Sequence, residues 1–325
     1  MKLHQLRYLA AVAQTGLNIT AAAEKLHTSQ PGVSKQIKLL EDELGFQIFV
    51  RDGRNLTRVT PAGQQVIDRA IRILREVQNI KRLSDDFKDE ARGSLSIATT
   101  HTQARYVLPD VIKEFRDRYP EVRLHLHQGT SEQIAEMAAL DRIDFAIATG
   151  SQETFDGFSL LPCYRWHRHV VVPRDHPLAR TKGRLTLKQL ANHPIITYVF
   201  SFSGPSSLHD IFAKEGLVPN VVLTARDADV IKTYVRLGLG VGIVASMAIE
   251  EKEDADLVHI DTSDLFPAHL TWIGFRRGGL LRKYQLDFIQ LFAPHLTRRL
   301  IERAAGASTQ SEVEQLTAGL ELPLK

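Results

Sequence analysis

The sequence NITAAAEKLHTSQPGVSKQIKLLEDELG, residues 18–45, contains two helix-forming segments separated by a short break. Residues 20–26 are rich in alanine, so a second helix can approach them closely. Residues 27–28 form the break. Ser29 is then a good helix N-cap, and Pro31 falls in the first turn, where its missing N–H is no loss. The stretch therefore predicts a helix-turn-helix.

The second predicted helix has one apolar side and one polar side. Its apolar residues recur at intervals of 4, 3 and 4 and form a face to be buried: Val33, Ile37, Leu40 and Leu44. Near its start, outward-facing polar and basic side chains can read base edges or hold phosphates. The residues that we assign to DNA contact here are Thr28, Gln30, Pro31, Ser34, Lys35 and Lys38. An ordinary helical hairpin in a core is the alternative, but the agreement of spacing, cap, proline position and charge favours DNA binding.

Residues 47–60, QIFVRDGRNLTRVT, read as two short strands joined at Asp52-Gly53, a strong hairpin dipeptide. Beside a recognition helix such a hairpin is a candidate wing. We predict that Arg51 and Arg54 contact DNA phosphates, and Arg58 lies near them. A solvated hairpin is the alternative for these arginines.

A long amphipathic helix is predicted to begin at Thr60-Pro61. Its apolar positions alternate at spacings of 4 and 3 over three heptads: Val66, Ala70, Ile73, Val77, Ile80, Ser84 and Phe87. This pattern is typical of a coiled-coil seam, and it predicts a dimer that recognises a DNA site with two-fold symmetry. Packing of the helix on its own domain is the alternative.

From residue 94 the pattern changes to strands that alternate with helices. The segments 94–100, 122–128 and 144–150 are predicted strands, with helices over 103–119 and 131–140 between them. A second run of the same kind follows, and residues 270–275 return to the first. Strand-helix-strand order implies parallel sheets covered on both faces, here in two lobes that form a cleft.

The expected fold is an N-terminal, all-α winged helix-turn-helix with a linker helix, followed by a two-lobed α/β domain. We place the DNA-binding domain at 1–60, the linker and dimerisation helix with its hinge at 61–92, the two-lobed domain at 93–300 and a C-terminal tail at 301–325. Residues 281–304 are expected to form one or two helices. After Gly306 the periodicity is lost, and the sequence leaves the tail poorly determined.

Short polar residues follow several predicted strands, where ligands bind in open α/β sheets. They are Thr99, Thr100, His101, Thr102 and Gln103 after the first strand, Thr149 after the third, and Ser201, Phe202, Ser203 and Gly204 ahead of a later helix. Hydroxyls, amides and helix N-termini without an arginine suggest a small polar or anionic ligand held by neutral donors. Ordinary helix capping by these residues is the alternative.

Composition is that of a globular protein: 325 residues, 43% hydrophobic and 24% charged, enough for two or three domains. The net charge of +3 hides an asymmetry, because residues 1–82 hold 13 basic and 7 acidic side chains and residues 83–325 hold 28 and 31. The basic end suits a polyanion. With a single cysteine, Cys163, and no run of about 18 apolar residues, we expect a cytoplasmic protein without a membrane span.

Catalytic and metal motifs are weak. Two pairs of histidines share a strand face, His125 with His127 and His167 with His169, but no cysteine or carboxylate completes a ligand set at the expected spacing. Asp227 and Asp229 lie at a predicted helix start, where capping is the ordinary explanation. We therefore predict no catalytic residue, no metal site and no cofactor. An α/β enzyme and a solute-binding protein are rival interpretations. An enzyme would need a nucleophile or a cofactor loop, which we do not find in the sequence. A solute-binding protein would need an export signal, which we do not find either.

On these residues the chain resembles the LysR-type transcriptional regulators, from Met1 to about Thr297. The family's N-terminal signature is met by AAAEKLHTSQPGVSKQIKLLEDELG, IFVRDGR and LTRVTPAG. Within the family it resembles the activators of the cysteine regulon through ATTHTQARYVLP, HQGTSEQIAE, DFAIAT, LPCYRWHR, DADVIKTYVRLGLGVGIVASMA and FIQLFAPHLTR. The resemblance implies a homotetramer, a dimer of dimers, whose periplasmic-binding-protein-like effector domain controls binding to promoter DNA.

The resemblance also implies the ligands. They are an inducer, N-acetylserine or O-acetylserine, with sulfide or thiosulfate acting against it. A sulfate- or thiosulfate-type anion is held between the lobes. The positions that match the family's anion site are Thr100, Thr102, Gln103, Thr149, the main chain near Trp166, and Ser203. The family usually has threonine where this chain has Ser203, so the hydroxyl is kept within a changed loop. The alternative is a regulator of another metabolic pathway that responds to a different small anion.

Overall fold

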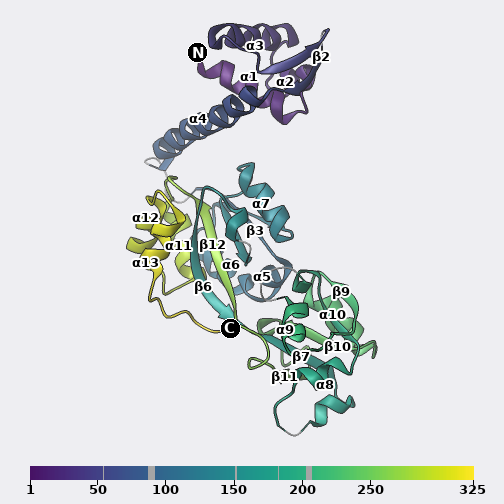
Figure 1. Ribbon diagram of the computed structural model, residues 1–325. Coiled ribbons are helices and arrows are strands. Elements are labelled where there is room, and N and C mark those ends of the chain that lie inside the picture. The colour runs from purple at the N-terminus through teal and green to yellow at the C-terminus, as the bar shows by residue number, and fades with distance from the viewer. Residues whose placement is uncertain (54, 87–91, 151, 182, 203–206) are drawn as a thin grey trace. The chain divides into compact units, whose positions relative to one another are not determined.

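The computed structural model describes residues 1–53, 55–86, 92–150, 152–181, 183–202 and 207–325 (Figure 1). The chain divides into two compact units, Met1–Asp89 and Glu90–Lys325. Among the described helices, none combines the length and apolar character that a membrane crossing needs.

The first unit is helical apart from one β-hairpin. Its elements are α1 (Leu3–Gln14), α2 (Ile19–Lys25), α3 (Gln30–Leu44), β1 (Phe49–Asp52), β2 (Asn55–Val59) and α4 (Pro61–Asp86). α1 contacts α2, α3 and α4. One apolar core holds these elements together, and the predicted winged helix-turn-helix is confirmed.

Both ends of α3 have the features that the sequence predicts. The Ser29 hydroxyl accepts a hydrogen bond from the Gly32 N–H at 3.3 Å. The helix ends at Gly45, whose φ of +75° is the left-handed conformation that favours glycine. Of the four residues at the predicted 4- and 3-residue intervals, Val33, Ile37 and Leu40 are at most 1% exposed. The fourth, Leu44 at the end of the helix, is only partly buried. The free side of α3 is therefore the side with the polar residues.

The hairpin is fixed to α3 by Glu41, which is 7% exposed. One carboxylate oxygen accepts the N–H groups of Ile48 at 2.9 Å and Phe49 at 3.1 Å, and the other accepts Arg51 at 2.7 Å. Charge-assisted hydrogen bonds of this kind are strong when they are shielded from water. Glu41 therefore sets the position of the wing relative to α3.

α4 starts close to the residues that precede the hairpin. Thr60 caps it, since its hydroxyl accepts the Gly63 N–H at 2.9 Å. A Cβ at Gly63 would lie 2.2 Å from the carbonyl oxygen of Ile48, so the close approach requires glycine.

The predicted seam of α4 divides into two parts. Ala70 is 1% exposed within the core of the first unit, whereas Ile73 is 40% and Ile80 59% exposed. Phe87 and the side chain of Ser84 lie outside the described residues. The start of the seam is therefore buried in the core of the first unit. The exposed apolar surface of α4 begins at Ile73.

The first lobe of the second unit is built on a five-stranded sheet with the order β4-β3-β5-β12-β6. Its strands are β3 (Gly93–Thr99), β4 (Val122–Gln128), β5 (Phe145–Thr149), β6 (Phe158–Trp166) and β12 (His269–Arg276). β3 runs parallel to β4 and β5, and β12 runs antiparallel to β5 and β6. The predicted return of the chain to the first lobe is confirmed by β12.

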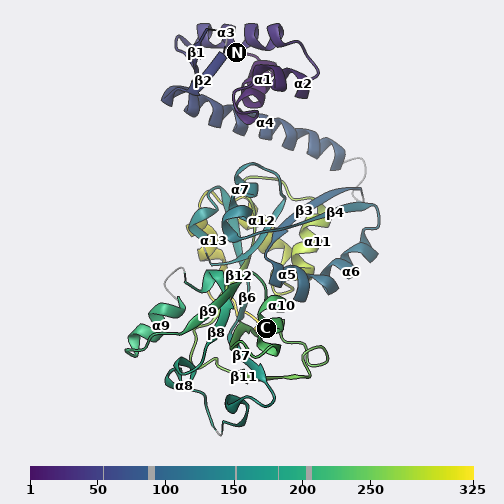
Figure 2. The same ribbon diagram turned by 90° about the vertical axis from the view of Figure 1, so that its right-hand side faces the viewer.

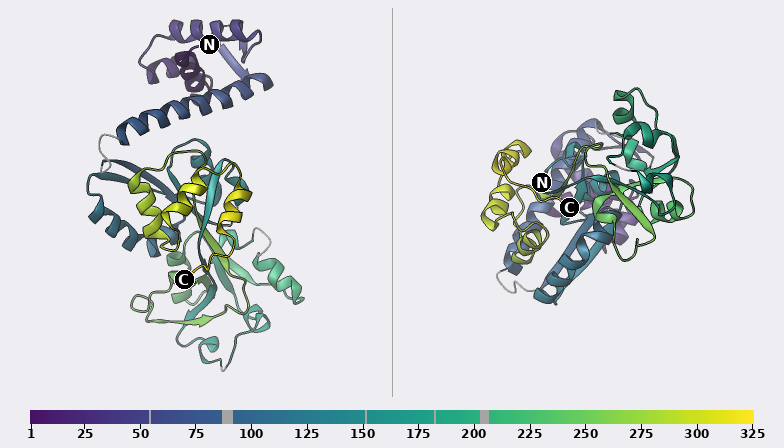
Figure 3. Two further views of the ribbon diagram at one scale, coloured as in Figure 1. Left: turned by 90° about the vertical axis from the view of Figure 1, so that its left-hand side faces the viewer. Right: turned by 90° about the horizontal axis from the view of Figure 1, so that it is seen from below.

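Helices cover both faces of this sheet. They are α5 (His101–Tyr106), α6 (Leu108–Arg118), α7 (Ser131–Ala139), α11 (Lys283–Phe292), α12 (Arg298–Ala305) and α13 (Gln310–Thr317), with the short η1 (Gln152–Thr154). Side chains of α6, α11, α12 and α13 share one core, and α7 packs on the opposite face of the sheet. Figure 3 shows α11, α12 and α13, in yellow, side by side on one face of this sheet.

The second lobe has a sheet with the order β11-β7-β10-β8-β9. Its strands are β7 (Arg168–Pro173), β8 (Ile195–Tyr198), β9 (Val221–Ala225), β10 (Val241–Ala245) and β11 (Leu257–Asp261). Its helices are η2 (Pro177–Arg180), α8 (Leu187–Ala191), η3 (Val199–Phe202), α9 (Leu208–Lys214), α10 (Ala228–Arg236) and η4 (Ser246–Ala248). α10 packs on one face, and α8 and α9 pack on the other (Figure 2).

Three details differ from the predictions. Both sheets are mixed and not parallel, because β12 and β7 run against their neighbours. The strands β6 and β11 were not predicted. The helix expected over 103–119 is two helices that meet at Val107, because Pro109 has no N–H to donate within a continuous helix and its ring would clash with the preceding turn.

The C-terminal segment is ordered and packs on the first lobe. The Gln310 amide accepts the Leu160 N–H at 3.0 Å and donates to the Leu160 carbonyl at 3.1 Å. Further on, the Lys325 N–H donates to the Arg165 carbonyl at 2.9 Å. α12 also runs across the boundary expected at residue 300. The lost periodicity after Gly306 therefore does not mark a loss of structure.

Candidate DNA-binding surface and effector site

The residues predicted to contact DNA from α3 lie on its unburied side. Thr28 and Ser34 are partly exposed, and Gln30, Pro31, Lys35 and Lys38 are exposed. The cap at Ser29 and the buried face opposite them hold these side chains at the N-terminal end of one rigid helix. A helix presented in this way suits insertion into a major groove.

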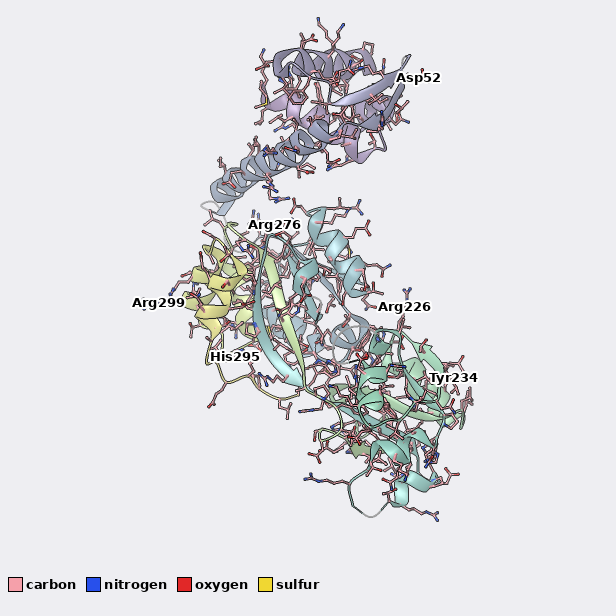
Figure 4. The ribbon with its side chains drawn as sticks, viewed as in Figure 1. Asp52, Arg226, Tyr234, Arg276, His295 and Arg299 are labelled. Carbon is pink, nitrogen blue, oxygen red and sulfur yellow. The ribbon has the colours of Figure 1, made fainter. Side chains whose placement is uncertain are left out.

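Asp52 lies at the end of β1, at the tip of the hairpin (Figure 4). Arg58 is exposed, whereas Arg51 is partly exposed and pairs with Glu41. The guanidinium of Arg51 thus positions the hairpin, and its contact with phosphate stays a prediction. Arg54 lies outside the described residues, so its contact stays a prediction as well.

In the second unit, several predicted ligand residues are joined in one hydrogen-bond network. The hydroxyl of Thr271, in β12, lies at its centre: it is 2.9 Å from the Thr149 hydroxyl, 3.1 Å from Trp166 Nε1 and 3.4 Å from Gln103 Nε2. The Tyr164 hydroxyl donates to Gln103 Oε1. The network thus connects the carboxyl end of β5 with the start of α5 and the end of β6.

The hydroxyls ahead of α5 are not used for capping. Thr100 occupies the N-cap position without a side-chain cap hydrogen bond, whereas Thr130 caps α7 by accepting the Gln133 N–H at 3.4 Å. Thr99 is fully buried, and its hydroxyl has no hydrogen-bond partner within the described residues. A buried polar group without a partner costs about 1–3 kcal/mol. These hydroxyls are therefore suited to bind a ligand.

The same segment touches the second lobe. Gln103 Nε2 lies 3.9 Å from Met247 Sδ, and the Tyr106 hydroxyl donates to Asp229 at 2.6 Å. The candidate effector site therefore lies where the two lobes meet. A ligand bound there would replace some of the contacts between the two lobes or would form new ones.

The later loop is described only in part. Ser201 is fully buried, and its hydroxyl lies 3.1 Å from that of Thr197, so it has a structural role. Ser203 lies outside the described residues, and its contact with a ligand stays a prediction.

One group of side chains in the described residues has the composition of a metal site. His101, Asp227 and Asp229 offer ligand atoms that all lie within 4.8 Å of one another. Both carboxylates already have structural partners: Asp227 accepts the Val230 N–H at 2.9 Å, which confirms the predicted helix cap, and Asp229 accepts the Tyr106 hydroxyl. The group is explained without a metal.

Similarity to known proteins covers both units. Residues 3–64 match the bacterial regulatory helix-turn-helix protein of the lysR family, and residues 88–297 match the LysR substrate binding domain. The chain belongs to the LysR family of transcriptional regulators. LysR-type regulators bind DNA and small-molecule effectors, so this LysR protein is a regulator and not an enzyme.

Its relatives within the LysR family are similar over nearly their whole length. The chain is 48% identical to the HTH-type transcriptional regulator CysB of Haemophilus influenzae over 100% of both chains. It is 47% identical to the regulator SsuR of Burkholderia cenocepacia over 91% of this chain and 96% of that one. Among solved structures, the cofactor-binding domain of the Cbl regulator has 44% identity and a TM-score of 0.63 over 68% of this chain and 96% of that one.

Other LysR-type structures resemble the chain in fold alone. Full-length CbnR in complex with its target DNA has 23% identity and a TM-score of 0.56, over 90% of this chain and 99% of that one.

Sequence reasoning missed three residues that position the two sites: Glu41, Tyr164 and Thr271. The signal for Thr271 was present, since it is a hydroxyl inside the apolar run LTWIGF. Glu41 and Tyr164 gave no such signal, because a charged residue on an amphipathic helix and a tyrosine in a strand are ordinary.

Proposed function

We propose that this LysR-type regulator mainly activates genes of sulfur assimilation and cysteine biosynthesis. The observation that carries the proposal is the 48% identity to CysB over the whole of both chains. The alternative is a LysR-type regulator of another pathway that responds to a different small anion.

The proposed effectors are N-acetylserine or O-acetylserine as inducer, and a sulfate- or thiosulfate-type anion. The residues proposed to hold the ligand are Thr100, Thr102, Gln103, Thr149, Trp166 and Ser203. The hydroxyls and amide of the network around Thr271 support this, because oriented neutral donors suit a small oxyanion. The ligand would act by population shift, as it changes the contacts that cross the lobes.

The proposed assembly is a dimer of dimers that binds promoter DNA. Exposed isoleucines on α4 support a helix-to-helix interface, and two α3 helices held by it would face a site with two-fold symmetry. The proposed DNA contacts are Thr28, Gln30, Pro31, Ser34, Lys35, Lys38, Arg51 and Arg54.

Gln30→Ala is expected to lower discrimination between the specific site and random duplex by about 1–3 kcal/mol, because a side chain that reads a base edge is lost. Arg54→Ala is the matched comparison. It is expected to weaken binding to both duplexes alike and to reduce the salt slope by about 1, as a phosphate contact does. Fluorescence anisotropy with both duplexes at several salt concentrations measures the two effects. Equal losses on both duplexes for both variants would contradict the assignment of α3 to the groove.

A bound effector is expected to stabilise the chain by about 2.7 kcal/mol at one hundred times its dissociation constant. Thermal shift with acetylserines, sulfate and thiosulfate measures this. Thr100→Val is expected to abolish the shift and leave the melting temperature of the free protein nearly unchanged, because Thr100 makes no side-chain cap bond.

The matched control for this test is Thr130→Val. Thr130 does cap its helix, so this variant is expected to lose about 0.5–2 kcal/mol of stability and to keep the ligand-induced shift. If no compound in the series shifts the wild-type melting temperature, the proposed effectors are wrong.

A further inference from the structure

A buried charge that the proposed site does not yet use lies at the start of β7. Arg168 is 2% exposed and follows directly after the segment in which the chain passes from the first lobe to the second. Moving a charged group into the protein interior costs several kcal/mol before its interactions compensate. Burial lowers the pKa of Arg168 to about 10, and the interaction with Tyr198 acts in the opposite direction. The guanidinium therefore still carries its charge at neutral pH.

The surroundings of Arg168 place this charge beside the candidate effector site. Its guanidinium carbon lies 5.9 Å from the centre of the Phe266 ring. Its charge acts on the pKa of both His269 and Tyr198. The His269 ring stacks on the proposed ligand residue Trp166 at 4.5 Å between ring centres. Arg168 pairs across the sheet with Ala245, whose N–H donates to the Tyr198 hydroxyl at 3.1 Å.

His269 is a second sign that this region is polar and enclosed. Its pKa is lowered to about 3, first by burial and then by Arg168 and His167, so the ring is neutral at pH 7. Its Nε2 is buried and has no hydrogen-bond partner within the described residues. Of these neighbours of the site, Arg168 thus contributes the positive charge, since His269 and Tyr198 are neutral.

We propose that Arg168 makes the interlobe site select effectors by their negative charge, with dianions bound more tightly than monoanions and monoanions more tightly than neutral compounds of the same shape. This inference rests on the proposed function, because it names the charge class of ligand for the same site. The neutral donors of Thr100, Thr149 and Gln103 orient a ligand, whereas a fixed charge sets how affinity depends on the ligand's own charge.

The expected size follows from Coulomb's law. For a separation on the order of 10 Å and an effective dielectric constant near 20, each unit of ligand charge changes the affinity by about 15-fold. Three tetrahedral sulfur compounds of similar size form a suitable series: sulfate with two negative charges, methanesulfonate with one, and dimethyl sulfone with none.

The experiment measures the affinity of the full chain for these three compounds by calorimetry, at constant ionic strength in chloride buffer. The wild type is expected to lose about 15-fold in affinity at each step of the series. Arg168→Met, which keeps the length of the side chain without its charge, is expected to flatten the series. Arg168→Lys keeps the charge and is expected to keep the steps.

The affinities of the three ligands are compared within one variant, so a general loss of stability affects all three alike and does not change their ratios. The proposal is overturned if the wild type shows no steps, if Arg168→Met keeps them, or if Arg168→Lys loses them. Arg168→Gln is a second neutral variant that is expected to flatten the series in the same way, so the charge of Arg168 is tested even if the methionine variant does not fold. A different result would show that the proposed function is wrong: the wild type would then bind neither sulfur anions nor acetylserines.

Discussion

The double variant Ile73→Asp/Ile80→Asp is expected to dissociate the proposed α4 interface and to bind operator DNA about 100- to 10,000-fold more weakly. Two linked DNA-binding heads gain this factor from effective concentration, and it is lost when the link is broken. The two side chains are 40% and 59% exposed, so the fold of the single chain does not need them. Burying each in a helix-to-helix seam contributes about 1.5–3 kcal/mol, and an aspartate there reverses the effect.

Sedimentation of the full chain and anisotropy with operator DNA check this result. Gln78→Asp adds one negative charge, where the double variant adds two, at an exposed position of α4 outside the 4-3 pattern. It is expected to leave both the assembly and the affinity close to the wild type. A double variant that keeps the wild-type sedimentation and affinity would show that α4 is not the interface.

Replacing Asp254 with alanine is expected to destabilise the chain by about 3–5 kcal/mol, because the substitution leaves a buried ammonium group without its carboxylate. Asp254 and Lys232 are 5% and 4% exposed, and they pair at 2.8 Å. Asp254 also accepts Arg236 at 2.8 Å and the Glu250 N–H at 2.9 Å. Lys232, Arg236 and Asp254 line an open pocket beside α10.

Urea denaturation at pH 7 measures the loss. Asp256→Ala is the matched control, since Asp256 pairs with the same Arg236 at 2.7 Å but is 56% exposed. An exposed pair contributes about 0–1 kcal/mol. Equal small losses for the two variants would show that the buried pair does not hold the second lobe together.

The same pair predicts a dependence of stability on pH. Burial alone would raise the pKa of Asp254, but the Glu250 N–H, Lys232 and Arg236 hold it below its usual value. A carboxylate with a lowered folded-state pKa contributes stability that is present above its unfolded-state pKa and is lost as pH falls through the folded-state value. The wild type is therefore expected to lose more stability than Asp254→Ala in acid below about pH 4.

The effector site shows the limit of reasoning from strand ends. Thr100, Thr102, Gln103 and Thr149 were identified because they follow strands, and Gln103 and Thr149 prove to be linked. The link is Thr271, which lies more than 100 residues further along the chain, in a strand that runs antiparallel to β5. Strand direction and register depend on contacts between distant segments, so a single sequence does not reveal which residue will stand opposite Thr149.

The burial of charged side chains was equally difficult to predict from the sequence. Glu41, Arg168, Lys232 and Asp254 are ordinary charged residues in the sequence, where nothing marks them as buried. Glu41 is buried by the hairpin that follows it within ten residues, and Lys232 pairs with a carboxylate 22 residues away. The burial of these groups therefore comes from tertiary packing and not from the local pattern of their own helices. The sequence reasoning considered only neutral polar groups for the effector site, and the proposed role of Arg168 was not among its predictions.

The sequence by itself determined the helix-turn-helix, its cap, the hairpin turn and the alternation of strands and helices. These depend on hydrogen bonds and side-chain spacings within a few residues of one another, which a linear pattern records. Only the tertiary structure decided that the sheets are mixed, that the C-terminal segment packs on β6, and that Thr271 and Arg168 stand at the junction of the lobes. Those outcomes depend on long-range packing, because the partners of each group come from segments that meet only when the chain has folded.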